Sequence, residues 1–244
     1  MKQSLFEIKS NLPLTDNVYK MTLTGDTSDI TASGQFVNIK LDGLYLRRPI
    51  SVCDCEGDTL TLIYKVVGKG TEQMSRMNEG KLDILTGLGN GYDLSVSGEK
   101  PLLLGGGVGV PPMYMLAKEL IKQGKQVSVI LGFNTASEVF YKDEFEKIGC
   151  KVYVTTVDGS MGEKGFVTDV MAKLDYTYFY TCGPEPMLKA VYKTSVTSGQ
   201  FSFEERMGCG FGACMGCSCK TVTGYKRICK DGPVLKKEEI LWEK

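Results

Sequence analysis

A cysteine-rich segment, residues 207–230, constrains this chain more than any other stretch of its 244 residues. It holds five of the nine cysteines, and three of them, Cys209, Cys214 and Cys217, have the spacing C-x4-C-x2-C. Eleven residues separate Cys217 from Cys229. Three closely spaced cysteines and a later fourth are typical of plant-type 2Fe–2S ligation, in which thiolates hold two bridged irons. The segment therefore predicts a 2Fe–2S cluster on these four residues.

Glycines alternate with the cysteines, at Gly208, Gly210, Gly212 and Gly216. A short loop around a cluster needs positive φ angles and backbone N–H groups that point at sulfur, and glycine allows both.

Three other interpretations of the cysteines remain open. Disulfides are disfavoured by the odd number of cysteines and by the lack of a secretory signal. Structural zinc usually takes two C-x2-C pairs, or cysteines with histidines, and the chain has no histidine. Reduced buried thiols fit poorly in a glycine-rich loop. Cys219 is left out as a ligand, because it would change the spacing to C-x4-C-x4-C.

The overall composition is that of a soluble globular protein, with 42% hydrophobic and 24% charged residues. The 29 basic and 29 acidic residues balance, so no nucleic-acid partner is expected. No apolar run approaches the length of a transmembrane helix, and the N-terminus lacks a signal-peptide pattern. A cytoplasmic location follows as the expectation. The lack of histidine removes the usual general base, so we assign no catalytic residue.

Residues 1–97 predict a small antiparallel barrel, because short β-rich runs alternate with turns. The strands are expected at 19–23, 35–41, 59–67 and 81–86, with one helix at 71–78. From residue 98 to about 200, strand and helix patterns alternate, which predicts a parallel α/β sheet covered on both faces. Strands are expected at 101–104, 126–132, 151–156 and 176–180, and helices at 113–123, 138–148, 165–174 and 186–197. Residues 201–244 form the predicted cluster domain.

Two loops at strand ends of the α/β part are candidate phosphate sites. Residues 105–112, GGGVGVPP, follow a strand and open a helix, where N–H groups and the helix dipole favour anions. The pattern is not G-x-G-x-x-G, and a tight turn without a ligand remains the alternative. Residues 181–187, TCGPEPM, occupy a second strand end, where we expect Cys182 to point into the crevice; a simple turn is again the alternative.

A third motif, LRRPIS at residues 46–51, offers two arginines and the hydroxyl of Ser51 to a diphosphate. An exposed basic strand end is its plain alternative. These motifs in order, with IYK at 63–65 and GKGT at 68–71, resemble the ferredoxin–NADP reductase superfamily. The later ERMGCGFGACMGC and CKDGPV resemble the electron-transfer subunits of class 1B dihydroorotate dehydrogenases.

That resemblance implies FAD on the barrel, NAD on the α/β domain and a 2Fe–2S cluster in the last domain. The residues that it places at FAD are Arg48, Pro49, Ile50, Ser51, Ile63, Tyr64, Lys65, Gly70 and Thr71. Those expected at the nucleotide are Gly105, Gly106, Gly107, Gly109, Cys182, Gly183 and Pro184, and the cluster ligands are Cys209, Cys214, Cys217 and Cys229.

The resemblance also implies a function. A partner subunit, expected to be an FMN-type TIM barrel in a heterotetramer, would oxidise dihydroorotate in pyrimidine biosynthesis. Electrons would then pass through the cluster and FAD to NAD⁺. A reductase subunit of a hydrogenase, a sulfide dehydrogenase or a transhydrogenase is an alternative. A zinc-stabilised interaction module is an alternative of another class.

Overall fold

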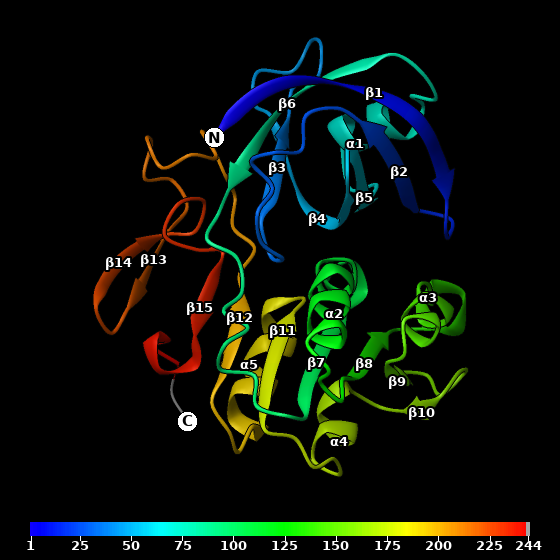
Figure 1. Cartoon of the computed structure of the whole chain (residues 1–244), viewed down its shortest axis with the longest axis vertical. Helices are drawn as coiled ribbons and strands as arrows, with labels where there is room; N and C mark the ends of the chain where they lie inside the picture. The colour runs from blue at the N-terminus through cyan, green and yellow to red at the C-terminus, as the bar shows by residue number, and fades with distance from the viewer. Residues whose placement is uncertain (243–244) are drawn as a thin grey trace.

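The computed structural model describes residues 1–242 and places a closed barrel above a larger α/β sheet (Figure 1). All barrel strands pair antiparallel in the order β1-β2-β5-β4-β3-β6. The strands are β1 (Lys2–Pro13), β2 (Val18–Thr24), β3 (Phe36–Ile39), β4 (Arg48–Glu56), β5 (Thr59–Lys65) and β6 (Lys81–Leu88), with helix α1 (Lys69–Ser75) after β5. The predicted barrel is thus confirmed.

Two barrel strands, β1 and β4, are absent from the sequence-based prediction. β1 carries seven polar residues in KQSLFEIKSNLP, because most of its outer face meets solvent. β4 contains Pro49 and two acidic residues, so its pattern does not look like a strand. β1 pairs with the distant strand β6, and β4 pairs with β3 and β5 on either side of it, so both are stabilised by pairing that local propensity does not report.

The α/β part contains a seven-stranded sheet in the order β10-β9-β8-β7-β11-β12-β15. All its strands run parallel except β15, which pairs antiparallel with β12. The strands are β7 (Pro101–Gly106), β8 (Ser128–Phe133), β9 (Lys151–Thr156), β10 (Glu163–Lys164), β11 (Tyr178–Cys182), β12 (Gly199–Ser202) and β15 (Val234–Lys236). The helices are α2 (Pro112–Lys122), α3 (Lys142–Lys147), α4 (Val167–Met171) and α5 (Glu185–Thr194).

Two predicted helices are shorter in the structure. The one expected at 138–148 divides into a 3₁₀ turn, η2 (Ala136–Glu138), and α3, because Tyr141 between them has a left-handed φ of 67°. The one expected at 165–174 begins only at Val167, since Gly165 has a φ of 126°.

The cysteine segment leaves the sheet at β12 and returns to it at β15. Between them lie a two-stranded sheet, β13 (Ser218–Thr221) and β14 (Gly224–Arg227), and the cysteine loop; the 3₁₀ turn η3 (Lys237–Glu239) follows β15. The expected domain boundary between residues 200 and 201 therefore falls inside β12. Because its two stems are neighbouring strands, the cysteine segment is held rigidly against the α/β sheet.

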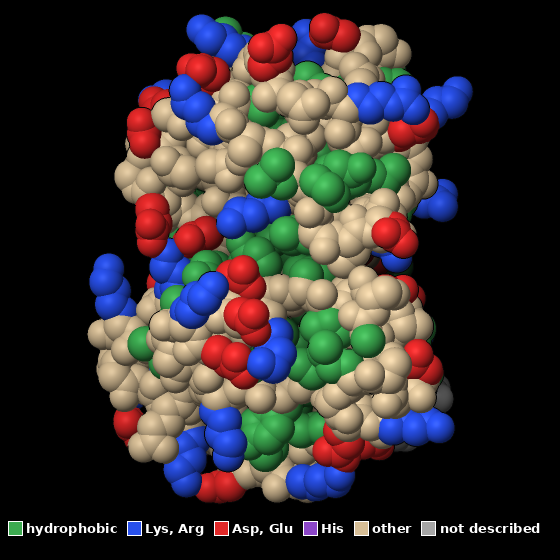
Figure 2. Space-filling model, turned by 90° about the vertical axis from the view of Figure 1, so that its right-hand side faces the viewer, with side chains coloured by type: hydrophobic (Ala, Val, Ile, Leu, Met, Phe, Trp, Pro, Cys, Tyr) green, Lys and Arg blue, Asp and Glu red, His purple; other side chains and the backbone are tan. Residues whose placement is uncertain are grey.

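Helix α2 joins the α/β sheet to the barrel. Lys118 on α2 makes an ion pair with Asp54 of β4 at 2.8 Å, and it also contacts Glu56. The hydroxyl of Ser33 donates to Glu119 at 2.7 Å. Figure 2 shows the face on the α3 side, where acidic and basic side chains are interspersed and hydrophobic side chains gather at the waist between the two parts. Within residues 1–242, no helix is both long and apolar enough to span a bilayer.

Candidate functional site

The two glycine-containing loops of the α/β sheet pack directly against each other. They follow β7, through the 3₁₀ turn η1 (Gly107–Gly109), and β11. A Cβ added at Gly109 would lie 2.2 Å from the carbonyl oxygen of Cys182, and one at Gly106 would lie 2.4 Å from the sulfur of Met187. The structure therefore brings the two predicted loops together, and close contact between loops explains these glycines.

Gly107 differs from the other glycines of its loop. Its φ is 53°, and a Cβ there would meet nothing within 4 Å. The loop thus keeps one open side, toward which its backbone can present N–H groups. Helix α2 begins immediately afterwards, with Pro111 as its N-cap and Pro112 at its first position, as the sequence predicts. Pro111 and Pro112 have no N–H, and the N–H groups of Met113 and Tyr114 are bonded to the carbonyl oxygens of Val110 and Pro111. Donors for an anionic group at the carboxyl edge of the sheet would therefore come from the loop backbone and not from the helix.

Cys182 ends β11 and is half-buried against the core beside α2. Burial raises the pKa of its thiol to about 12, while a hydrogen bond with Ser202 acts in the opposite direction. Cys182 is therefore a neutral thiol at physiological pH.

The barrel motif and the GKGT segment also meet in space. A Cβ added at Gly70 would lie 2.1 Å from Nε of Arg48, so the guanidinium group of Arg48 lies against the first turn of α1. The helix expected to start at Thr71 begins two residues earlier, so Thr71 is the third helical residue and Gly68 is the N-cap. The Thr71 hydroxyl accepts from the backbone N–H of Val67 at 2.9 Å and is committed to its own loop.

The Tyr64 ring does not fit the expected role against a flavin. It lies inside the barrel at 2% exposure, and its hydroxyl donates to Oδ1 of Asn11 at 3.0 Å. Asn11 in turn donates to the carbonyl oxygens of Met74 and Met77, at 2.8 and 3.0 Å, at the end of α1. Tyr64 therefore supports α1 from inside the barrel. The next residue back, Ile63, points to the opposite face of β5 and packs in the cluster that includes α2.

The four cysteines of the predicted cluster come from one loop and from the turn after β14. Sγ of Cys209 accepts backbone N–H groups of Ala213 and Cys214, at 3.2 and 3.4 Å. Sγ of Cys217 accepts the N–H of Cys229 at 3.4 Å. Cys217 and Cys229 are each 2% exposed, whereas Cys214 lies at the surface. Such N–H···S bonds stabilise thiolates and tune iron–sulfur centres.

The thiols influence one another electrostatically. Partial burial opposes ionisation of Cys209, but N–H groups from Phe211, Cys214 and Ala213 and the Cys214 side chain lower its pKa to about 6. Burial, the Cys217 thiol and the charge of Cys209 raise the pKa of Cys229 to about 12. Within the described residues, no three His, Cys, Asp or Glu side chains converge closely enough for a single metal ion. The cysteine spacing and the N–H donors to sulfur support this ligand set.

The backbone of the loop passes close to the sulfur of Cys214. A Cβ added at Gly208 would lie 3.2 Å from Sγ of Cys214 and would crowd it, whereas one at Gly216 would lie at 3.5 Å, an ordinary contact. Gly210 and Gly212 have φ angles of 78° and 92°, and the non-glycine Met215 has 62°. A left-handed non-glycine residue stores strain, and strain of this kind is concentrated at ligand clamps. The loop geometry therefore fits a 2Fe–2S cluster.

Cys219 lies apart from these four, on β13. It borders a cavity of about 260 Å³ that Glu204, Trp242 and Pro184 also line. Burial raises the pKa of its thiol.

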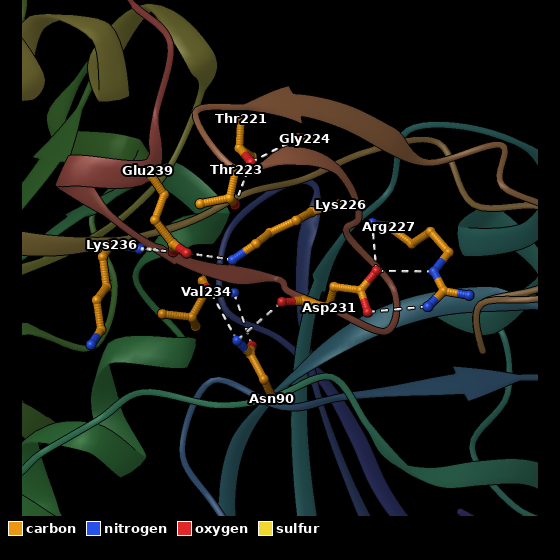
Figure 3. A network of polar contacts seen from close by, with 10 residues as sticks. All are labelled: Asn90, Thr221, Thr223, Gly224, Lys226, Arg227, Asp231, Val234, Lys236 and Glu239. Atoms are coloured by element: carbon orange, nitrogen blue, oxygen red, sulfur yellow. Dashed lines mark hydrogen bonds and ion pairs between the residues drawn. The ribbon is translucent and has the colours of Figure 1, made fainter.

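A polar network ties the cysteine segment to the rest of the molecule (Figure 3). Arg227 makes an ion pair with Asp231 at 2.9 Å and donates through Nη1 to the carbonyl oxygen of Gly212 at 2.9 Å. Asn90, just after β6, donates to the carbonyl oxygen of Val234 at 2.8 Å and accepts its N–H at 3.1 Å. No sequence motif marks Arg227 or Asn90, since their partners come together only in the fold.

Comparisons with known proteins agree with this geometry. Residues 204–241 match the model of the iron–sulfur cluster binding domain of dihydroorotate dehydrogenase B, and residues 103–193 match the oxidoreductase NAD-binding domain. A dihydroorotate dehydrogenase B (NAD(+)) electron transfer subunit from Fusobacterium nucleatum is 46% identical, over 93% of this chain and 94% of the relative. One from a Geobacillus species is 43% identical, over 99% of both.

A solved NADH-dependent reduced ferredoxin-NADP oxidoreductase, described in terms of flavin-based electron bifurcation, has a TM-score of 0.88. It is 30% identical and covers 97% of this chain and 90% of its own. The barrel, the α/β sheet and the cysteine segment thus recur together in a flavin-dependent oxidoreductase.

Proposed function

Because the chain belongs to the family of dihydroorotate dehydrogenase B electron transfer subunits, we propose that its cysteine loop receives electrons from a dihydroorotate-oxidising partner subunit. The chain is an FAD- and 2Fe–2S-containing subunit of an NAD-dependent oxidoreductase of pyrimidine biosynthesis. The observation that carries the proposal is the cysteine loop with its N–H···S bonds, which contacts the barrel at Asn38 and has its stems in strands β12 and β15 of the α/β sheet. A cytoplasmic location remains our expectation.

The cofactors supply the electron chemistry when bound: a 2Fe–2S cluster carries single electrons, whereas a flavin can exchange two with a pyridine nucleotide. The protein residues bind and orient them. Cys209, Cys214, Cys217 and Cys229 are proposed to hold the cluster. Arg48 and the turn at Gly70 are proposed to bind the FAD diphosphate through a planar guanidinium group and backbone N–H donors.

The nucleotide is proposed to bind at the paired loops after β7 and β11. The glycines at 105, 106, 107 and 109 let the first loop approach the second, where Cys182, Gly183 and Pro184 lie. Gly107 offers the open backbone side. The half-buried, neutral thiol of Cys182 leaves no second negative charge beside the diphosphate.

The docking surface for the partner is proposed to surround Cys214. Cys214 is exposed, and the neighbouring Phe211 and Met215 are 43% and 53% exposed. Large exposed apolar side chains next to a redox centre suit a protein contact that excludes water. A partner of TIM-barrel fold and a heterotetrameric assembly stay expectations from the family resemblance.

Activity of the separate and mixed subunits tests this proposal. The purified chain alone should reduce dyes with NADH but should not oxidise dihydroorotate, which should begin only when the partner is added. The double variant Phe211→Ser, Met215→Ser should show slower dihydroorotate oxidation with the partner, while its reduction of dyes by NADH stays normal. Val196→Ser is the matched control, since Val196 is 87% exposed but lies before the amino end of β12, whereas the cysteine segment leaves from the carboxyl end of that strand. Dihydroorotate turnover by the chain alone would contradict the two-subunit proposal.

The alternatives are less well supported. The 30% identity to the ferredoxin-NADP oxidoreductase is lower than the 46% and 43% to the dihydroorotate dehydrogenase subunits. The match of residues 204–241 is to an iron–sulfur domain, which argues against a zinc-stabilised interaction module.

A further inference from the structure

One polar side chain, that of Asn38, is buried on the outer face of the barrel, where the cysteine loop covers strand β3. All four residues of β3 are buried, and Val37 and Ile39 beside Asn38 have no exposed surface. Asn38 itself is 1% exposed. Burying a carboxamide is unfavourable unless its groups find hydrogen-bond partners. Because Val37 and Ile39 point into the barrel, Asn38 between them points outward, and a buried polar group at that place needs a specific explanation.

The amide of Asn38 contacts the cysteine loop. Nδ2 donates to the carbonyl oxygen of Cys209, 171 residues away in sequence, at 3.2 Å. The next residue, Gly210, has a φ of 78°, and a Cβ there would lie 2.3 Å from Nδ2. Gly210 thus permits both the turn of the loop and its close approach to β3.

The other half of the Asn38 amide has no partner. Among the described residues, Oδ1 is buried and accepts no hydrogen bond. Flipping the amide would not help, because Oδ1 would then face the carbonyl oxygen of Cys209 and the one good bond would be lost. The strand therefore keeps a polar residue for a single bond, the one that reaches the first cysteine of the proposed cluster.

The barrel side of Asn38 is fixed as well. Asn38 lies opposite Pro49 of β4, which belongs to the proposed FAD segment. Pro49 has no N–H to offer, and the Asn38 carbonyl accepts Nη1 of Arg47 at 3.2 Å. Arg47 is held in turn by Asp83, at 3.0 Å. Asn38 thus pairs with the strand that carries the proposed FAD segment, and its side chain hydrogen-bonds the loop of the proposed cluster.

We propose that Asn38 is a positioning residue that fixes the cluster loop against the flavin-binding barrel, and so sets the geometry between the two redox centres. This role rests on the cofactor sites proposed above. A side chain that orients a metal ligand without touching the metal typically contributes about 10–100-fold to metal retention or activity.

The test replaces Asn38 by Leu, which fills a similar volume without polar groups. Release of iron to a chelator should be about tenfold faster in Asn38→Leu, and the electron paramagnetic resonance signal of the dithionite-reduced cluster should change in shape. FAD content and the rate at which NADH bleaches the flavin should stay near wild type, while reduction of the cluster by NADH slows. Iron release, signal and cluster reduction all equal to wild type would overturn the proposal.

A second pair of variants keeps the proposal testable if Asn38→Leu folds poorly. Gly210→Ala acts from the loop side by driving a Cβ toward Nδ2. Gly224→Ala is its control, because Gly224 has a φ of 115° but open space around it, in the β13–β14 turn. Faster iron release from Gly210→Ala than from Gly224→Ala supports the role, and equal rates refute it. Failure of the proposed function would look different, since the wild-type chain itself would then lack iron and flavin.

Discussion

Substitution of Gly109 by alanine should separate the two loops of the nucleotide site. The new Cβ would lie 2.2 Å from the carbonyl oxygen of Cys182 and 2.6 Å from the backbone nitrogen of Gly183. A carbon and a carbonyl oxygen approach to roughly 3.3 Å at closest, so the loops must move apart by about 1 Å. Both neighbours are backbone atoms, so no side chain can rotate away to relieve the clash.

The expected cost of Gly109→Ala is about 1–3 kcal/mol of unfolding free energy, which is typical of overpacking. The effect on function should be larger, because a displacement of about 1 Å at a reacting site can cost up to about 100-fold in rate. Urea unfolding measures the first effect. NADH–dye reductase kinetics measure the second, as a raised KM for NADH and a reduced kcat.

Gly149→Ala is the matched control. Gly149 has a φ of 95° and nothing within 4 Å of an added Cβ, so alanine there should cost about 1–2 kcal/mol through backbone strain alone. It lies after α3, outside both loops, and its NADH kinetics should match wild type. If Gly109→Ala and Gly149→Ala show the same NADH kinetics, the contact between the loops does not shape the nucleotide site.

Four further outcomes are expected. Burial raises the pKa of Glu119 above its unfolded value, so its contribution to stability is fully present at low pH and is lost as pH rises through the folded pKa; Glu119→Gln should therefore raise Tm at pH 8 and not at pH 4. Tyr64→Phe leaves Oδ1 of Asn11 without its buried partner and should cost about 1–3 kcal/mol in urea unfolding, with weaker FAD retention through α1; unchanged stability would argue against the Tyr64–Asn11 link. Asn90→Ala breaks both bonds to Val234 and should cost about 1–2 kcal/mol and speed iron loss, whereas equal stability would show that β15 is held by its pairing with β12 alone. Cys229→Ser should bleach the visible absorbance while Cys219→Ser should not, and the opposite pattern would reassign the fourth ligand.

Several elements could be predicted from local sequence because they are determined locally. Strand β9 begins and ends at the predicted residues, Lys151 and Thr156. Pro111 and Pro112 mark the start of α2, and the glycine run before them marks the turn. The cysteine spacing identified the cluster segment without any knowledge of the fold.

Other features depend on pairings distant in sequence. β12 and β15 are short and stabilise each other across more than thirty residues, so neither stands out alone. The bond from Asn38 to Cys209 joins two domains and cannot be seen from either segment. The sequence marks this bond only by one polar residue, Asn38, within the apolar strand β3.

The place of Tyr64 could have been inferred. Leu60, Leu62 and Tyr64 alternate along β5, and the two leucines point into the barrel, so the same face must hold the Tyr64 ring. The family resemblance points to residues 63–65 as a whole. The alternation of side chains along β5 determines which of them can contact a ligand.

Cofactor analysis of the chain as purified, together with the partner that accompanies it, tests the central claim most directly. We expect a brown protein with about two irons and two acid-labile sulfides per chain, held by four thiolates, and with FAD released on denaturation. A colourless chain that carries one zinc ion and no flavin would contradict it.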